Sequence, residues 1–191
     1  MRVFIAVDIN EQVKAAIGRL QEQLKKKREA GPFSTEQVKW VRREAMHLTL
    51  KFLGEIDNEQ LAAVSKIIEE IAKERKSFEL DVESAGFFGG RAAKVLWVGS
   101  TRGSEKLCDL AKAIEERLAE AGFPKEEREF SAHLTICRIK DLASGKRLAE
   151  EAGKLGSFKA GTVLIDAVKV YQSQLMPTGP VYTVLGNYKL Q

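Results

Sequence analysis

The chain has 191 residues, of which 44% are hydrophobic and 30% charged, and its formal net charge is +4. This composition excludes a disordered or fibrous chain and predicts a water-soluble protein with either one well-buried core or two small lobes that share an interface. No apolar run is long enough to cross a membrane, and the isolated cysteines Cys108 and Cys137 show no CxxC spacing. We therefore expect a cytoplasmic protein with reduced thiols, whose slight positive charge permits a polyanionic partner without requiring one.

The first elements are a buried strand and an amphipathic helix. Residues 2–9 are β-branched and apolar, which predicts a strand buried on both faces. Residues 10–29 carry apolar side chains at helical spacing behind Asn10, the predicted N-cap. The basic run at 25–28 is expected to be solvated at the end of this helix, with contact to phosphates as the alternative. Gly31 and Pro32 break the helix.

The remaining elements repeat one order. After the break we expect a strand over 47–53, a helix over 58–75 and a hairpin with strands over 78–85 and 93–99. The second copy consists of a helix over 104–121, a break at 122–124, a strand at 133–136, a weaker helix over 144–155 and strand runs over 158–171 and 181–188. The order of helix, break, histidine strand, helix and hairpin therefore occurs twice.

Two copies of this order predict an α+β fold with two similar lobes related by a pseudo-two-fold axis. Antiparallel sheets from both lobes would line a central groove, with the helices packed outside. No linker or low-complexity segment separates the copies, so we expect residues 1–191 to form a single bilobal domain.

The two histidines of the chain open matching tetrapeptides, HLTL at 47–50 and HLTI at 133–136. Side chains alternate between the faces of a strand, so His47 lies beside Thr49 and His133 beside Thr135. The aliphatic residues between them anchor each strand in the core. With the lobes related by a two-fold axis, the two His–Thr pairs face each other across the groove.

Two imidazoles beside one reacting centre suit acid–base chemistry. The unperturbed imidazole pKa near 6.5 allows a neutral ring to take a proton from an attacking group and a protonated ring to give one to a leaving oxygen. The threonine hydroxyls supply neutral donors for non-bridging oxygens. Phosphodiester cleavage uses this combination of a base, an acid and hydrogen-bond donors. It requires no metal when the histidines and the donors stabilise the charge on the phosphate.

Three other interpretations of the paired motif stay open. One is a remnant of duplication without function. Another is a metal site completed by carboxylates elsewhere in the fold, although Glu44, Glu55, Asp57 and Glu129 form no HExxH or HxH grouping with the histidines. The weakest is a Ser–His–Asp triad, because the chain has no GxSxG elbow and a triad needs one histidine.

Three segments together resemble the two-histidine (2H) phosphoesterase superfamily: HLTLKFLGE at 47–55, HLTICR at 133–138 and SQLMPTGPVY at 173–182. Within it the chain is most similar to the RNA 2′,3′-cyclic phosphodiesterase family, also called 2′-5′ RNA ligase, over essentially its whole length. The resemblance implies the bilobal α+β fold and hydrolysis of a terminal 2′,3′-cyclic phosphate to a 2′-phosphomonoester. It also implies reversible joining of RNA ends through a 2′-5′ linkage, without a cofactor or a metal.

The resemblance also implies roles for individual residues. His47 would donate a proton to the leaving O3′, and His133 would be the base that activates water. Thr49 and Thr135 would hold the phosphate, and Arg138 would add a cationic contact. The choice of donor and base rests on the family alone, because the repeat makes the two histidines interchangeable.

The implied partner is an RNA with a 2′,3′-cyclic phosphate end, and tRNA halves are candidates. No membrane and no obligate protein partner are expected. Two alternative functions stay open: an RNA-end binding module with little turnover, and a cyclic phosphodiesterase that acts on small nucleotides such as ADP-ribose 1″,2″-cyclic phosphate. Within the leading function, ligation rather than hydrolysis is the alternative physiological direction.

Several aromatic and basic residues lie outside the motifs. Tyr182, Phe87 and Phe88 are candidates for stacking on a base, whereas Phe52 is expected in the core. Trp40 and Trp97 are also expected in the core. Lys51 and Arg91 are expected on the solvated surface, with RNA phosphates as the alternative contact.

Overall fold

The computed structural model describes residues 1–29, 37–177 and 179–191, so the predicted break at Gly31 and Pro32 lies outside the described residues. The elements are, in chain order, β1 (Arg2–Asp8), α1 (Glu11–Glu29), β2 (Val38–Trp40), the 3-10 turn η2 (Arg43–Ala45), β3 (His47–Glu55), α2 (Asn58–Lys73), β4 (Phe78–Phe88), β5 (Val95–Ser100), α3 (Ser104–Glu120), β6 (His133–Ile139), α4 (Leu142–Gly153), β7 (Lys159–Ile165), β8 (Ala167–Met176) and β9 (Gly179–Lys189).

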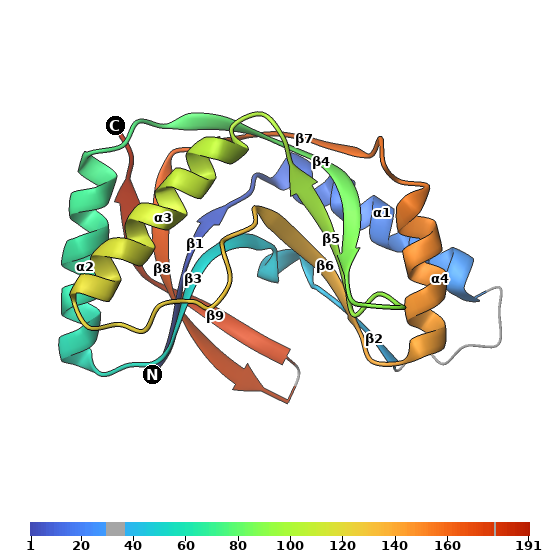
Figure 1. The fold of residues 1–191 in the computed structure, drawn as a ribbon, viewed down its shortest axis with the longest axis horizontal. Coiled ribbons are helices and arrows are strands. Elements are labelled where there is room, and N and C mark those ends of the chain that lie inside the picture. The colour runs from blue at the N-terminus through green and yellow to red at the C-terminus, as the bar shows by residue number, and fades with distance from the viewer. Residues whose placement is uncertain (30–36, 178) are drawn as a thin grey trace.

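The strands form two antiparallel sheets, one in each lobe. Sheet A has the order β3-β1-β8-β9, and sheet B has the order β2-β6-β5-β4-β7. Helices α2 and α3 pack beside sheet A, whereas α1 and α4 pack beside sheet B (Figure 1). The histidine strand β3 belongs to sheet A and the histidine strand β6 to sheet B. The predicted α+β fold of two lobes with helices outside is confirmed.

The chain passes between the lobes more often than the repeat predicts. The single run predicted over 158–171 is wrong, because it consists of β7 in sheet B and β8 in sheet A. The chain crosses at Asp166, whose carbonyl accepts a hydrogen bond from the amide of Leu190 at 2.8 Å. Apolar residues continue on both sides of this point, so the hydrophobic pattern shows no break. Sheet A therefore joins the first strand of the chain to the last two.

Strand β1 is buried on both faces, as its sequence predicts. Val3, Ile5 and Val7 point into the main core, in which they lie with sheet B residues such as Leu96 and Ile136. On its other face, Phe4 and Ala6 pack with Tyr171 and form a small second cluster. Burial on both faces explains why this strand lacks polar alternation.

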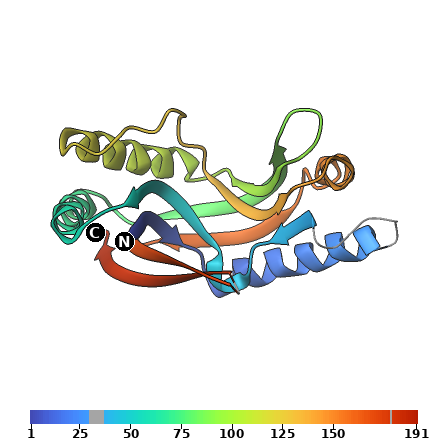
Figure 2. The ribbon, with the colours of Figure 1, turned by 90° about the horizontal axis from the view of Figure 1, so that it is seen from below.

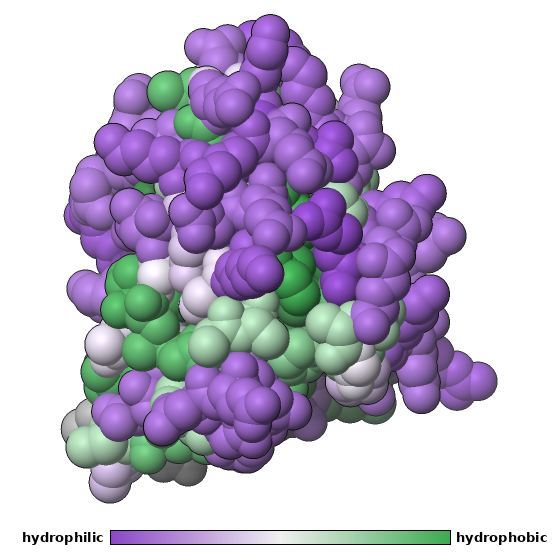
Figure 3. All heavy atoms as spheres, turned by 90° about the vertical axis from the view of Figure 1, so that its left-hand side faces the viewer, coloured by the Kyte–Doolittle hydropathy of each residue, from purple (hydrophilic) through white to green (hydrophobic). Residues whose placement is uncertain are grey.

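The β8–β9 hairpin carries apolar side chains on the surface. Figure 3 shows apolar atoms gathered on the lower half of the sheet A side, and Figure 1 shows the hairpin projecting at that end. The exposed apolar residues of the hairpin are Leu175, Met176, Val181, Val184 and Leu185. None of the helices in the described part of the chain is long and apolar enough to cross a membrane.

A buried glutamine ties α1 to sheet B. The side-chain amide of Gln21 donates hydrogen bonds of 2.9 Å to the carbonyl oxygens of Val41 and Ile136. Ile136 lies in the second histidine tetrapeptide, so this amide links α1 directly to the strand of His133. An apolar side chain at position 21 would leave the Val41 carbonyl without this donor, and a buried carbonyl without a donor destabilises the folded state.

We predict that Gln21→Leu lowers the free energy of unfolding by about 1–3 kcal/mol, the usual cost of removing a partner from buried polar groups. Urea denaturation measures the change. Gln23→Leu is the matched control, because Gln23 is exposed on the same helix and should leave stability nearly unchanged. Equal stability of the two variants would contradict the assigned role of Gln21.

Candidate active site

A cavity of about 800 Å³ lies between the two sheets. Its lining includes His47 and Thr49 from β3 together with His133, Thr135 and Arg138 from β6. The five residues singled out by the sequence therefore come from two strands in different sheets and meet in one cavity. Ser173, Leu175 and Pro180 of the β8–β9 hairpin contribute to another part of the wall.

A β-bulge in each histidine strand decides which side chains reach the cavity. In β3 the register passes from Ala6↔Thr49 to Ile5↔Lys51, which leaves Leu50 as the extra residue. In β6 the register passes from Trp97↔Thr135 to Leu96↔Cys137, which leaves Ile136 as the extra residue. An extra residue reverses the alternation of the residues that follow it. The two tetrapeptides therefore share a backbone irregularity as well as a sequence.

The bulges explain why the residue five positions after each histidine lies in the cavity. Strict alternation would place Arg138 on the opposite face from Thr135, but the bulge returns it to the cavity. Phe52, the equivalent residue after His47, lines the cavity for the same reason. Its predicted place in the core is wrong, because 58% of its surface is exposed.

His133 is oriented by a backbone carbonyl. Its Nδ1 lies 2.7 Å from the carbonyl oxygen of Ser131. Because a carbonyl only accepts hydrogen bonds, Nδ1 carries a proton, and Nε2 is the atom that binds or releases the second proton. The ring of Phe88 meets the imidazole edge-on at 4.8 Å between centroids.

Trp97 is half-buried, lies outside the main core cluster and packs against His133, so its predicted place in the core is wrong. The ring centroids of Trp97 and His133 are 6.4 Å apart. The indole lies so close to Gly86 that a Cβ on that glycine would fall 2.4 Å from it. A glycine is therefore required at position 86 for the indole to lie flat on the strand beside His133. Trp40, also predicted in the core, is half-buried: it packs against the main core and also lines the cavity.

His47 is held by aromatic rings. Its imidazole stacks on Phe4 with centroids 4.7 Å apart, and Tyr182 meets it edge-on at 5.2 Å. Burial lowers the pKa of His47 to about 4, because removal from water disfavours the imidazolium. The charge of Asp8 opposes this shift and that of Lys14 adds to it. In the free protein His47 is therefore neutral at neutral pH.

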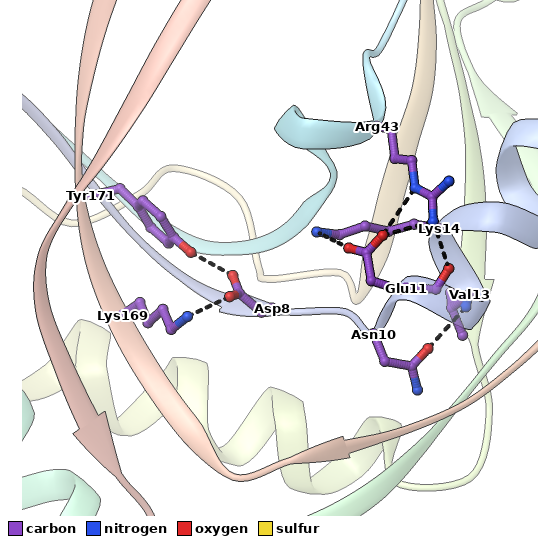
Figure 4. Close-up of polar contacts among 8 residues, drawn as sticks. All are labelled: Asp8, Asn10, Glu11, Val13, Lys14, Arg43, Lys169 and Tyr171. Carbon is purple, nitrogen blue, oxygen red and sulfur yellow. Dashed lines mark hydrogen bonds and ion pairs between the residues drawn. The ribbon is translucent and has the colours of Figure 1, made fainter.

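Asp8 is the β1 residue paired with His47 in the sheet register. Its carboxylate accepts hydrogen bonds from the Tyr171 hydroxyl at 2.5 Å and from Lys169 Nζ at 2.6 Å (Figure 4). Burial alone would raise the pKa of Asp8, but these two donors hold it below its usual value. Asp8 is therefore an anion at neutral pH, and its charge favours the protonated form of His47.

The cavity wall carries positive charge. Arg2, Lys39, Arg42 and Arg138 line it, and among the residues that the structure describes no Asp or Glu does. Burial raises the pKa of the Tyr182 phenol, whereas the charges of Arg138, Arg2 and Arg42 act to lower it. These three guanidinium groups therefore lie within electrostatic reach of one side chain that contacts His47. Such a cavity favours an anionic ligand.

Sequence reasoning missed Arg2, Lys39 and Arg42. None of them belongs to a motif. Arg2 and Lys39 reach the cavity through long-range pairing of β1 and β2, and Arg42 lies just after β2, at the start of η2. The predicted surface position of Lys51 is also wrong. Its side chain is buried by the bulge, and its Nζ lies 2.7 Å from Glu115 and 2.9 Å from the Pro124 carbonyl.

Three or more His, Cys, Asp or Glu side chains do not come together anywhere in residues 1–29, 37–177 and 179–191 to form a candidate metal site. Glu44, Glu55, Asp57 and Glu129 do not line the cavity with the histidines. The carboxylates considered as extra ligands are therefore not placed to complete such a site.

Two histidine–threonine pairs, on matching bulged strands around one basic cavity, define a phosphoesterase of the two-histidine class. The chain belongs to the LigT-like phosphoesterases, whose family model matches residues 7–97 and 98–182. Each matched half contains one of the two histidine tetrapeptides, in agreement with the internal repeat.

Related sequences and solved structures align with nearly the whole of this chain. A protein of Methanothermobacter thermautotrophicus named RNA 2′,3′-cyclic phosphodiesterase is 30% identical over 100% of this chain and 99% of its own length. A protein of the same name from Methanocaldococcus jannaschii is 34% identical over 97% of this chain and 98% of its own. The crystal structure of TT0787 of Thermus thermophilus matches with a TM-score of 0.80 and 26% identity, covering 100% of this chain and 98% of the other.

We predict that the His47 resonance titrates with a midpoint near pH 4 in the free protein, as the lowered pKa requires. Proton–carbon NMR of the imidazole Cε1 groups measures this, with His47→Gln to assign the signal. A bound phosphate anion should move the midpoint upward, since a nearby negative charge favours the imidazolium. Adding 2′-AMP tests that shift.

The same pKa has a consequence for stability. Between about pH 4 and 6.5 the unfolded chain binds more protons at residue 47 than the folded chain, so the free energy of unfolding falls as the pH falls through this window. The contribution reaches at most about 1.4 kcal/mol per pH unit. His47→Gln should flatten the dependence relative to the unmodified protein, and identical slopes would contradict a buried, neutral His47.

Proposed function

We propose that this chain hydrolyses the terminal 2′,3′-cyclic phosphate of RNA to a 2′-phosphomonoester by acid–base catalysis, without a metal or a cofactor. The observation that carries the proposal is the convergence of His47, Thr49, His133, Thr135 and Arg138 on one basic cavity. The relatives named RNA 2′,3′-cyclic phosphodiesterase support the choice of substrate.

In the proposed reaction His133 is the base. Its Nδ1–H is engaged by the Ser131 carbonyl, so the lone pair of Nε2 takes a proton from water. The water oxygen bonds to phosphorus on the side opposite O3′, and the P–O3′ bond breaks. His47 gives a proton to O3′, which leaves a 3′-hydroxyl and a 2′-phosphomonoester. Exchange of protons with solvent then restores both histidines.

The remaining residues of the cavity stabilise charge on the phosphate. The hydroxyls of Thr49 and Thr135 donate hydrogen bonds to the non-bridging oxygens, and the guanidinium of Arg138 adds a positive charge. Arg2 and Arg42 extend the positive wall. A low-dielectric wall of aromatic rings strengthens these interactions relative to water.

The acid role of His47 requires that its imidazole takes up a proton from solvent when the anionic substrate binds. With a pKa of about 4, His47 is neutral in the free protein at neutral pH. The negative charge of the cyclic phosphate adds to that of Asp8, and together they offset the desolvation of the imidazolium. Protonation of His47 is thus coupled to occupation of the cavity, which keeps the acid uncharged until a phosphate binds.

We propose RNA ends, including those of tRNA halves in the cytoplasm, as the substrates. Hydrolysis is favoured over 2′-5′ ligation because water is present at a far higher concentration than any RNA 5′-hydroxyl. Turnover of a panel of cyclic phosphates distinguishes this function from the two alternatives. An RNA-end binding module would bind without turnover, and a small-nucleotide enzyme would prefer ADP-ribose 1″,2″-cyclic phosphate to an RNA end.

We predict that His47→Ala and His133→Ala each lower kcat for a cyclic-phosphate RNA by about 10²–10⁴-fold, the range of one general acid or base. Turnover by the unmodified protein should persist in EDTA. Lys66→Ala on α2 serves as the control for expression and folding, because Lys66 is exposed outside the cavity. A loss of less than about tenfold in either histidine variant would contradict the two-proton scheme.

The separate roles of the two histidines predict different responses to the leaving group. A p-nitrophenolate leaving group needs no proton, so His47→Ala should lose much less activity on a p-nitrophenyl phosphodiester than on a cyclic phosphate. His133→Ala should lose a similar factor on both substrates, since water still requires a base. The opposite pattern would assign His47 as the base and His133 as the acid.

A further inference from the structure

A second concave surface lies on the exposed side of α1, outside the active-site cavity. This hollow has a volume of about 580 Å³, and its charged lining consists of Lys14, Arg19, Glu22, Lys26 and Arg43. Residues 14, 18, 22 and 26 follow one another at intervals of one helical turn, so the hollow runs along a single face of the helix. Its cations outnumber its one carboxylate by four to one.

The hollow is lined by Gly18, a glycine that neither the packing nor the backbone conformation of the folded chain requires. Gly18 lies inside the 19-residue helix α1, where glycine costs roughly 0.5–1 kcal/mol relative to alanine. Apart from its chain neighbours and the adjacent backbone of the helix, no heavy atom lies within 4 Å of the position that a Cβ would occupy, and φ of Gly18 is not among the positive values. Neither packing nor backbone conformation explains the residue. Together with Ala15, it leaves the helix backbone open to close approach from outside.

Two cations of the hollow are not neutralised within the described chain. Lys14 and Arg43 share the carboxylate of Glu11, at 3.3 and 2.7 Å (Figure 4). Glu22 forms an ion pair with Lys25 at 2.6 Å. For Arg19 and Lys26, no ion pair joins them to any of residues 1–29, 37–177 and 179–191. The hollow therefore presents surplus positive charge around an open helix backbone.

The hollow adjoins the active-site cavity through η2. Arg42 lines the cavity, and the next residue, Arg43, lines the hollow. Figure 2 shows η2 between the start of α1 and the β8–β9 hairpin, and Arg42 donates a hydrogen bond of 3.1 Å to the Pro180 carbonyl in that hairpin. Gln21 fixes α1 to the strand of His133. The two positively charged sites are thus held at a constant separation.

We propose that this hollow binds backbone phosphates of the RNA strand whose cyclic-phosphate end occupies the active-site cavity. The inference rests on the proposed function and deepens it, because it makes a strand of several nucleotides the preferred substrate. Lys14 to Lys26 spans roughly 18 Å of helix, which accommodates several phosphates of an extended strand. The contacts are to phosphates alone, so the hollow supplies affinity without base specificity.

The test compares two substrates that differ only in the presence of a strand. One is an RNA of about 12 nucleotides ending in a 2′,3′-cyclic phosphate, within the range of known single-strand site sizes, and the other is 2′,3′-cyclic AMP. Arg19→Glu/Lys26→Glu should raise KM for the RNA by about tenfold at low salt and reduce the slope of log KM against log salt by about 0.7 per lost phosphate contact. KM for 2′,3′-cyclic AMP and kcat for both substrates should not change.

The matched control is Lys66→Glu/Lys106→Glu, which makes the same change in net charge on α2 and α3. It should leave KM for the RNA within about twofold of the original value, because neither residue lines the hollow. A loss in the control as large as that in Arg19→Glu/Lys26→Glu would overturn the proposal, since the effect would then come from overall charge. Equal changes for RNA and 2′,3′-cyclic AMP would also overturn it.

Gly18→Leu provides a second test that does not alter charge. Leucine favours the helix and fills the open floor, so this variant should melt no lower than the original protein while KM for the RNA rises several-fold. Unchanged KM for the RNA would overturn the proposal. If Gly18→Leu lost binding to anionic lipid vesicles but kept the RNA kinetics of the original protein, the hollow would be assigned to a membrane surface instead.

The hollow can still be tested if the proposed catalytic function is wrong. If the original protein turns over neither substrate, fluorescence anisotropy with a labelled 12-nucleotide RNA ending in a 3′-phosphate still reports on the hollow, because that length matches the probe chosen for kinetics. Weaker binding by Arg19→Glu/Lys26→Glu, with the Lys66→Glu/Lys106→Glu control unchanged, would then support the hollow as an RNA site. Equal binding by all three proteins would overturn it.

Discussion

The bulge in each histidine strand is the constraint on which the composition of the cavity depends. A regular strand would send Arg138 and Phe52 away from the cavity and bring Cys137 and Lys51 into it. The bulges at Leu50 and Ile136 reverse this arrangement. The carbonyl of Ile136 accepts hydrogen bonds from the Val41 amide and the Gln21 side chain, at 3.0 and 2.9 Å. The irregular backbone is therefore stabilised by α1 and by the segment that follows β2, and both border the positively charged surfaces.

The sequence predicts the parts of this structure that local patterns determine. Alternation and helical spacing locate the histidine strands and the helices, and the repeat predicts two lobes. The paired tetrapeptides predict the neighbours of each histidine, because His and Thr two positions apart share a face before the bulge begins. Arg138 is predicted only through the family resemblance, since alternation alone places it on the wrong face. These successes depend on contacts within one strand or one helix.

The failures share a different cause, which is pairing between distant segments. The sequence around Lys51 predicts a surface residue. The register of β3 with β1 instead places its side chain in the core beside Glu115. The crossing of the chain between the sheets at Asp166 is not visible in the hydrophobic pattern, because apolar residues continue into β8. Arg2 reaches the cavity only because β1 pairs with both β3 and β8. A single sequence contains no signal for such pairings, whose choice depends on the energy of the whole sheet.

Departures from the two-fold relation give the two histidines different surroundings. Arg138 follows His133 at the position where Phe52 follows His47, so the cation is on one side and the aromatic ring on the other. His47 stacks among rings that disfavour its charge, whereas a carbonyl holds one proton on His133 and leaves Nε2 to act. The proposed roles, an acid that gains its proton only beside a bound phosphate and a base with a fixed tautomer, are different requirements. In this proposal a duplicated motif meets both because the residues around the two histidines differ, and not the histidines themselves.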